Sequence, residues 1–239
     1  MRKFKKTLSI LLIISIIAPI LPTEGITAYG EEAKVTKIEI ARTMGELGEQ
    51  GKYTVIIHGR DLNKAEILYK YSGVAEYIPM PPQLPGSGNT LKQYSIDAGI
   101  AITHIKIDDS EFRVLEDNMP EITKVTNDEG KDTKQFDLNS EEELKIEGNN
   151  FNKIGTELIE GIQYKTTLTI GNKTADDYFK YGSPVFLNKD ALRSFGTGRK
   201  NILIERTSKQ NGIDVQISYL QNYVFRIYES IDINIDEDI

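Results

Sequence analysis

The sequence predicts an all-β protein in which two tandem β-sandwich domains follow an export signal. Three observations lead to this fold class. Short runs of residues alternate between apolar and polar side chains, turns rich in glycine and proline separate these runs, and one pattern of residues occurs twice. We expect a signal peptide at 1–30, a first domain at 34–118, a second domain at 119–230, and an acidic tail or the start of a further domain at 231–239.

The first thirty residues have the order of a secretory signal peptide. A basic tip precedes an apolar run at 8–21, and short polar and small residues follow. Ala28 and Gly30 place small side chains third from last and last before a cleavage after Gly30, with cleavage after Ala28 as the alternative. An uncleaved membrane anchor fits less well, because the run is short and Pro19 and Pro22 interrupt its end.

Composition excludes several kinds of chemistry. The 239 residues include no cysteine, no tryptophan and two histidines. The lack of cysteine excludes disulfides, a lipoprotein anchor, zinc–thiolate sites and thiol nucleophiles. Two histidines leave little material for metal clusters or histidine-based acid–base catalysis, so we expect a protein that is not an enzyme and holds no cofactor.

Charge and hydropathy indicate where the protein works. The formal net charge is −7, and the basic signal segment carries +3, so the mature chain carries −10. An acidic balance disfavours nucleic acid as a partner. No later apolar run is long enough to span a bilayer, so we expect no membrane span in the mature chain. An exported chain without disulfides is typical of a bacterial secreted or cell-surface protein.

The repeated pattern divides the mature chain into two related parts. The matching segments are 35–38 with 122–125, 57–64 with 146–153, and 112–114 with 225–227. Their separations grow from 87 to 89 and then to 113 residues while their order is kept, so the second copy contains insertions. A spacing near 90 residues is one small domain rather than a solenoid repeat.

Alternation predicts which side chains of each copy face a core. The expected core positions lie two residues apart in each strand: Tyr53, Val55 and Ile57; Leu144 and Ile146; Leu168 and Ile170; Ile202 and Ile204; Val215, Ile217 and Tyr219. A single helical turn is expected at 188–195, with Asn188 or Asp190 as its cap.

The repeated turn has a physical rationale. Gly59 and Gly148 fall where a strand ends, and there a positive φ is expected. Leu62 and Phe151 can fold back over the end of a sandwich as an apolar plug. The neighbouring asparagines can hydrogen-bond their own backbone in the turn.

The segments at 120–125 and 144–151, which read Pro-Glu-Ile-Thr-Lys-Val and Leu-Lys-Ile-Glu-Gly-Asn-Asn-Phe, resemble the opening of an IPT/TIG immunoglobulin-like domain. The segments at 167–172, 183–185 and 198–204 resemble its later strands, so the resemblance covers most of 119–230. The first domain matches less well, because it lacks the leading proline and has a proline-rich loop at 79–88. The resemblance implies two tandem Ig-like (IPT/TIG-type) β-sandwich domains.

The resemblance also implies a function without catalysis, because it supplies no catalytic motif. The hypothesis is an extracellular binding or adhesion module of a bacterial surface or secreted protein, with a protein or cell-envelope partner and a glycan as a further option. The alternative is a spacer or accessory region, with carbohydrate binding as an option, of a larger secreted enzyme or toxin. A purely structural stalk is the third hypothesis.

Paired tyrosines are the candidate partner surface. Tyr69 and Tyr71 form one pair, and Tyr178 and Tyr181 lie in a second cluster with Phe179. Alternation would place Tyr69 with Tyr71, and Phe179 with Tyr181, on common faces. Exposed tyrosines suit protein recognition or sugar stacking, although packing against a sheet or core is the simpler interpretation.

We interpret the remaining polar residues as solvent-exposed surface rather than as catalytic or metal-binding groups. His58 and His104 are interpreted as ordinary strand residues, and the carboxylate pairs 108–109 and 176–177 as surface. Acidic residues near the domain ends leave calcium as a minor option, since no calcium-loop spacing occurs; they are Asp108, Asp109, Glu111, Glu116, Asp117, Asp232, Asp236, Glu237 and Asp238.

Overall fold

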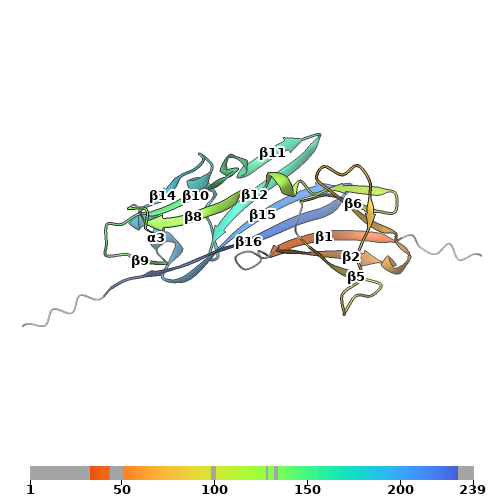
Figure 1. Ribbon diagram of the computed structural model, residues 1–239, viewed down its shortest axis with the longest axis horizontal. Coiled ribbons are helices and arrows are strands. Elements are labelled where there is room, and N and C mark those ends of the chain that lie inside the picture. The colour runs from red at the N-terminus through yellow and green to blue at the C-terminus, as the bar shows by residue number, and fades with distance from the viewer. Residues whose placement is uncertain (1–32, 44–50, 98–100, 128, 132–133, 231–239) are drawn as a thin grey trace, which may run out of the picture. The chain divides into compact units, whose positions relative to one another are not determined.

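The predicted alternation is present in strands of both halves of the chain. The structure is a computed structural model that describes residues 33–43, 51–97, 101–127, 129–131 and 134–230 (Figure 1). All the side chains expected to face a core from 53–57, 144–146, 168–170, 202–204 and 215–219 are buried. The all-β fold class is therefore confirmed. The expected signal peptide and the tail at 231–239 lie outside the described residues.

The first half, up to residue 118, places its strands in two groups. One group is β1 (Lys34–Thr43), β2 (Lys52–Arg60) and β5 (Leu91–Asp97), in which β2 lies between the other two. The other is a four-stranded sheet in the order β4 (Ile78–Pro79), β3 (Ile67–Tyr71), β6 (Ile102–Ile107) and β7 (Ser110–Arg113). Short 3-10 helices at Leu62–Lys64 (η1) and Glu116–Asn118 (η2) complete this half.

The second half also divides its strands between two sheets. Its three-stranded sheet has the order β14 (Val185–Leu187), β10 (Leu144–Asn149) and β8 (Glu121–Asn127). Its other strands are β9 (Gln135–Asp137), β11 (Gly155–Ile159), β12 (Ile162–Ile170), β13 (Lys173–Thr174), β15 (Gly198–Gln210) and β16 (Ile213–Tyr228). Helical segments are η3 (Phe151–Lys153), α2 (Asp176–Phe179) and α3 (Lys189–Phe195). Side chains from all three sheets of the molecule belong to one buried hydrophobic cluster.

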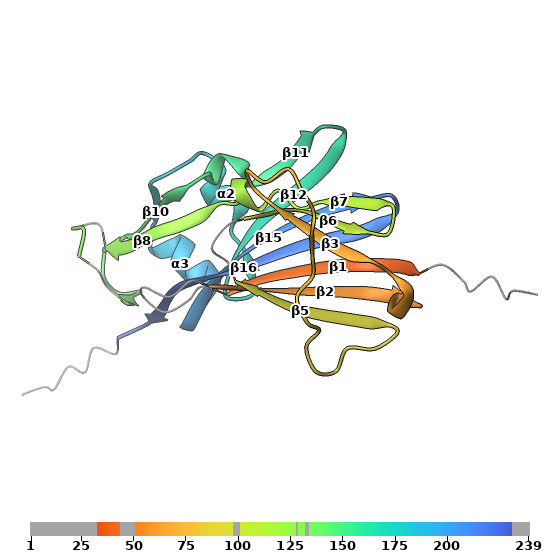
Figure 2. The ribbon, with the colours of Figure 1, turned by 45° about the vertical axis from the view of Figure 1, so that its right-hand side comes forward.

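One sheet runs from the first half into the second without a break. The main path of this nine-stranded sheet has the order β11-β12-β15-β16-β1-β2-β5. β16 pairs in parallel with β1 from Asp214 opposite Lys37 to Leu220 opposite Thr43, and further along it pairs with β9. Figure 2 shows β15 and β16 extending from the second half alongside β1. The described residues from Ala33 onward belong to one compact unit, in which η2 ends at Asn118, the last residue of the expected first domain.

Polar side chains reinforce this junction. Arg206 of β15 is buried, and its guanidinium donates to the carbonyl oxygens of Leu115 (2.9 Å) and Asn118 (3.1 Å) and to the hydroxyl of Thr166 (2.9 Å). The buried amide of Gln210 exchanges two 2.8 Å bonds with the backbone N–H and C=O of Arg113. The long hairpin of the second half therefore bonds directly to the segment that links the halves.

The repeated turn has the same geometry in both halves, but the expected conformation of its glycine is wrong. The left-handed residues are Asp61 (φ 56°) and Asn150 (φ 57°), two positions later. Gly59 and Gly148 instead allow close contact, because a Cβ there would meet the carbonyl of the first strand and the plug residue. Leu62 and Phe151 are buried, which confirms the apolar plug.

The asparagine bonds in this turn also differ from expectation. The Nδ2 of Asn150 donates to the carbonyl of Met119 (3.3 Å), and the backbone N–H of Asn63 donates to the side chain of Asn89 (3.3 Å). The turn is therefore bonded to neighbouring chain segments.

The structure confirms the expected helix at 188–195 and contains a second helix, α2, that the sequence analysis did not predict. α3 begins after Asn188, whose side chain accepts a bond from the N–H of Ala191 (3.0 Å), as the expected cap. The segment 176–179 is helical rather than extended, so Phe179 is buried and Tyr181 exposed. Their expected common face was wrong because strand alternation does not hold through a helix. No helix in the described residues is long and apolar enough to cross a bilayer.

Candidate functional site

The first tyrosine pair lies mostly against the core. Tyr69 and Tyr71 project from the same side of β3, as alternation predicted, and their rings meet edge to face at 5.0 Å with hydroxyl oxygens 3.0 Å apart. Tyr69 is only 8% exposed, and burial raises the pKa of its hydroxyl to about 12. Tyr71 is half-buried. Little of Tyr69 is therefore accessible to a partner.

The second tyrosine pair is on the surface, together with a phenylalanine that sequence reasoning missed. Tyr178 is 39% exposed, Tyr181 86% and Phe186 50%. We call these three residues the aromatic segment; Tyr178 lies in α2, Tyr181 in the connection that follows and Phe186 in β14. The Nζ of Lys180 lies 5.1 Å from the ring centroid of Tyr181, and that of Lys145 lies 6.0 Å from Phe186. Each of these two exposed rings thus carries a cation on one face.

Well-packed neighbours hold the backbone of the aromatic segment. Phe179, between the two tyrosines, is fully buried and packs edge to face on Phe151, the plug of the repeated turn, at 5.2 Å. The carboxylate of Asp176 accepts a 2.6 Å bond from the N–H of Leu168. The ring of Tyr178 also contacts Phe195 at 5.9 Å. The exposed rings are therefore presented by an ordered part of the second half.

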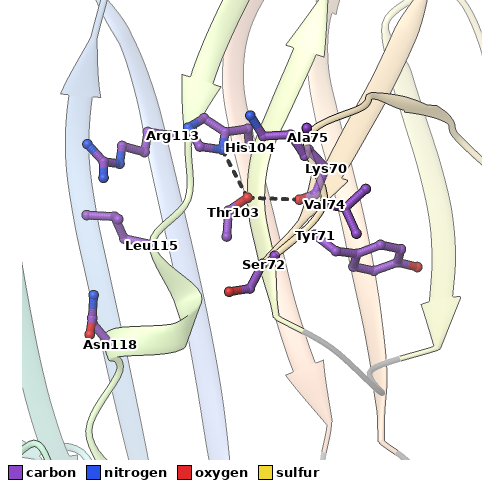
Figure 3. A pocket seen from close by; sticks show the side chains of 11 residues that line it. Lys70, Tyr71, Ser72, Val74, Ala75, Thr103, His104, Arg113, Leu115 and Asn118 are labelled. Atoms are coloured by element: carbon purple, nitrogen blue, oxygen red, sulfur yellow. Dashed lines mark hydrogen bonds between the residues drawn. The ribbon is translucent and has the colours of Figure 1, made fainter.

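A separate open groove lies in the first half, on the outer face of the four-stranded sheet. It encloses about 440 Å³ next to η2, and its wall includes Lys70, Thr103, His104, Arg113 and Leu115 (Figure 3). The ring of Tyr71 points away from it, so this tyrosine contributes backbone to the wall. Sequence alone offered no signal for this groove, because its residues come from four separate elements.

The two histidines have different surroundings. The Nε2 of His58 lies 2.6 Å from the carboxylate of Glu39, which Lys37 also contacts, and hydrogen bonds from these groups lower the pKa of Glu39. His104 lines the groove, and burial followed by the cation of Lys70 lowers its pKa. Among the described residues, no group of three or more histidine and acidic side chains could hold a metal ion.

Several of the acidic residues considered for calcium or catalysis have separate partners. Asp108 accepts a bond from the N–H of Glu66 (2.8 Å), and Glu116 is buried against Arg42 (2.5 Å). Asp176 and Asp177 also differ, since the latter is exposed and pairs with Lys180 (2.8 Å). The expected acidic residues at 232–238 lie outside the described residues.

Comparisons with known proteins find no matching family model, no matching curated protein and no matching solved structure.

Proposed function

We propose that the protein is a non-catalytic binding or adhesion module of a bacterial surface or secreted protein, built from two tandem Ig-like domains of the IPT/TIG type. The observation that carries this proposal is the aromatic segment. Three large aromatic side chains are exposed within nine residues of chain, at 39%, 86% and 50% of their surface. Exposed aromatic clusters are typical of interaction sites, where tyrosine is enriched.

The geometry of the aromatic segment suits a protein or cell-envelope partner. A tyrosine offers a wide apolar face and a hydroxyl with few rotatable bonds, so little conformational entropy is lost on binding. The cations of Lys145 and Lys180 beside Phe186 and Tyr181 add donors for acidic or polar groups. Stacking on a sugar ring is the glycan option, and it would use the same exposed faces.

Two features support the Ig-like assignment. Both halves divide their strands between two sheets, and both place the same left-handed turn and buried plug after their second long strand. The resemblance of 119–230 to the IPT/TIG pattern supports the proposed family, and the signal peptide expected at 1–30 supports a location outside the cytoplasm.

A matched pair of variants tests the binding surface. The double variant Tyr181→Ser, Phe186→Ser removes exposed rings, and Leu158→Ser, Leu220→Ser removes equally exposed apolar side chains that lie on β11 and β16. We expect partners captured from envelope or host extracts by the wild-type chain, identified by mass spectrometry, to lose at least about tenfold in affinity with the first variant. The second variant should bind like wild type. Equal capture by all three proteins would contradict the proposal.

The alternative function, a spacer or accessory region of a larger secreted protein, is favoured by a different observation. The β1–β16 pairing and the buried Arg206 join the halves through a continuous sheet. A stiff connection is useful where a module must hold a fixed distance. If no extract yields a partner and nuclear spin relaxation shows both halves tumbling as one body, the spacer function is preferred. Hydrolytic activity in this chain would overturn both versions of the non-catalytic proposal.

A further inference from the structure

Three basic side chains form a row across the outer face of the four-stranded sheet. Lys70 of β3 is in register with His104 of β6, and His104 is in register with Arg113 of β7. Figure 3 shows the three side chains following one another across the strands, above the groove. Lys70 and Arg113 are permanent cations on either side of His104, which joins them as a third cation only when its ring is protonated.

The surrounding carboxylates neutralise this row only in part. Glu111 lies 3.5 Å from the Nε2 of His104, and Glu160, in the turn between β11 and β12, pairs with Arg113 and is itself 72% exposed. The pKa of His104 is lowered by burial first and then by Lys70, with Arg113 acting in the same direction and Glu111 and Glu160 in the opposite one. Burial and the neighbouring cations therefore outweigh the carboxylates in their effect on the pKa of the His104 imidazole.

One buried hydrogen-bond donor of the groove lining lacks an acceptor. Within the described part of the chain, the buried Nε of Arg113 has no hydrogen-bond partner. The hydroxyl of Thr103 donates to the carbonyl of Lys70 (3.2 Å), so its oxygen accepts from the Nδ1 of His104 (3.0 Å). The Nε2 of neutral His104 then presents a lone pair, and it becomes a donor when the ring is protonated. An anion in the groove would accept from the Nε of Arg113, and it would accept from the Nε2 of His104 once the ring is protonated.

We propose that this groove binds the oxyanion group of a small ligand, a phosphate, sulfate or carboxylate held by Lys70, His104 and Arg113. The volume of about 440 Å³ exceeds that of a bare ion, and Val74, Ala75 and Leu115 supply an apolar wall beside the cations. The size of the groove and its apolar wall suit a small organic molecule that carries the anionic group. This site is distinct from the aromatic segment, which lies on other elements in the second half.

Nuclear magnetic resonance of the imidazole groups tests the proposal directly, because the chain has only two histidines. His58 on β2 serves as the internal control. The probes are inorganic phosphate, phenyl phosphate, sulfate and acetate, each compared with chloride at equal ionic strength. We expect phosphate and phenyl phosphate to shift the signals of His104 with saturation and to raise its pKa, since an anion favours the protonated ring. The signals of His58 should not saturate in this way.

The pH dependence and two variants complete the test. Affinity for sulfate, whose charge stays constant in this range, should rise as pH falls through the pKa of His104, with Lys70, Arg113, Glu111 and Glu160 as the charged groups that face it. Lys70→Gln should weaken phosphate binding about tenfold, as loss of a charged hydrogen-bond donor does. Lys165→Gln, at an exposed position of β12, should bind like wild type.

Several outcomes would overturn the proposal. They are no saturable shift of His104 with any probe at tens of millimolar, equal shifts of His58, or unchanged affinity in Lys70→Gln. Tighter binding of phenyl phosphate than of phosphate would identify an organic ester as the ligand class, and the reverse order would reduce the site to one for the free ion. The variant Tyr181→Ser should respond as wild type does, so failure here and failure of the proposed function are distinguishable.

Discussion

The two halves of the molecule begin alike and end differently. Their repeated turns superpose in backbone conformation, with Asp61 and Asn150 at φ 56° and 57° and a buried plug one residue later. Their last two strands do not correspond in length. β6 and β7 have six and four residues, whereas β15 and β16 have thirteen and sixteen.

This difference explains what the insertions in the second copy do. The separation between matching segments grows most before the last match, where Phe112 corresponds to Phe225. Part of that extra length is in β15 and β16, whose hairpin turns at Asn211 (φ 51°) and Gly212 (φ 81°) and reaches the first half. Added strand length thus converts two repeated units into one continuous sheet, with β16 occupying the outer edge of β1.

The largest expected effect tests whether the two halves unfold together. Ile57 and Ile146 are equivalent residues of the repeat and are both fully buried. Changing either to alanine should cost about 2–5 kcal/mol, because methyl groups leave the core and a cavity remains. Because the sheet is continuous, we expect both variants to lower a single urea transition followed by circular dichroism.

Smaller substitutions at the same two positions allow the free energy of unfolding to be measured if the alanine variants are too unstable. Ile57→Val and Ile146→Val should cost about 0.5–1.5 kcal/mol each, and Thr54→Ala on the other face of β2 serves as a control. Two separate transitions, each sensitive to one isoleucine, would show that the halves are independent domains despite the shared sheet.

The next effect concerns the junction. Replacing Arg206 with methionine keeps much of the volume but removes the bonds to the carbonyls of Leu115 and Asn118, which are left without this donor. We expect a loss of about 2–4 kcal/mol in the free energy of unfolding, and faster hydrogen exchange around η2. Arg199→Met, at an exposed position of the same strand, should change stability little. Wild-type stability in the Arg206 variant would refute the role of this side chain in joining the halves.

The smallest expected loss of stability comes from substituting the two glycines of the repeated turn. A Cβ at Gly59 would clash with the carbonyl oxygen of Lys34 and lie 2.9 Å from the Cδ2 of Leu62. A Cβ at Gly148 would clash with the carbonyl oxygen of Glu121 and lie 2.5 Å from the ring of Phe151. Both alanine variants should cost about 1–3 kcal/mol by overpacking, with Gly148→Ala the worse. Adding Phe151→Leu should then restore part of the loss. Gly88→Ala, which meets open space, is the thermal-melting control, and equal stability of all four variants would refute close packing here.

Local patterns predicted the strands and the turn because their causes are local. Alternation at 53–57 or 202–204 reports which side chains a sheet buries, and Asn188 caps α3 through a bond to a residue three positions away. The exposure of the candidate tyrosines could not be predicted from such local patterns. Tyr69 and Tyr178 look alike in sequence, yet one faces the core and the other is exposed, because α2 interrupts the strand pattern at 176–179.

The sequence by itself determined the all-β class, the alternation that selects core residues and the presence of a repeated turn. The tertiary structure alone decided that β16 pairs with β1, that Arg206 bonds to the linking segment, and that Lys70, His104 and Arg113 form one row. The physical reason is the range of the interactions. Burial and turn geometry act over a few residues, whereas strand pairing joins residues about 180 positions apart, as in Lys37 opposite Asp214.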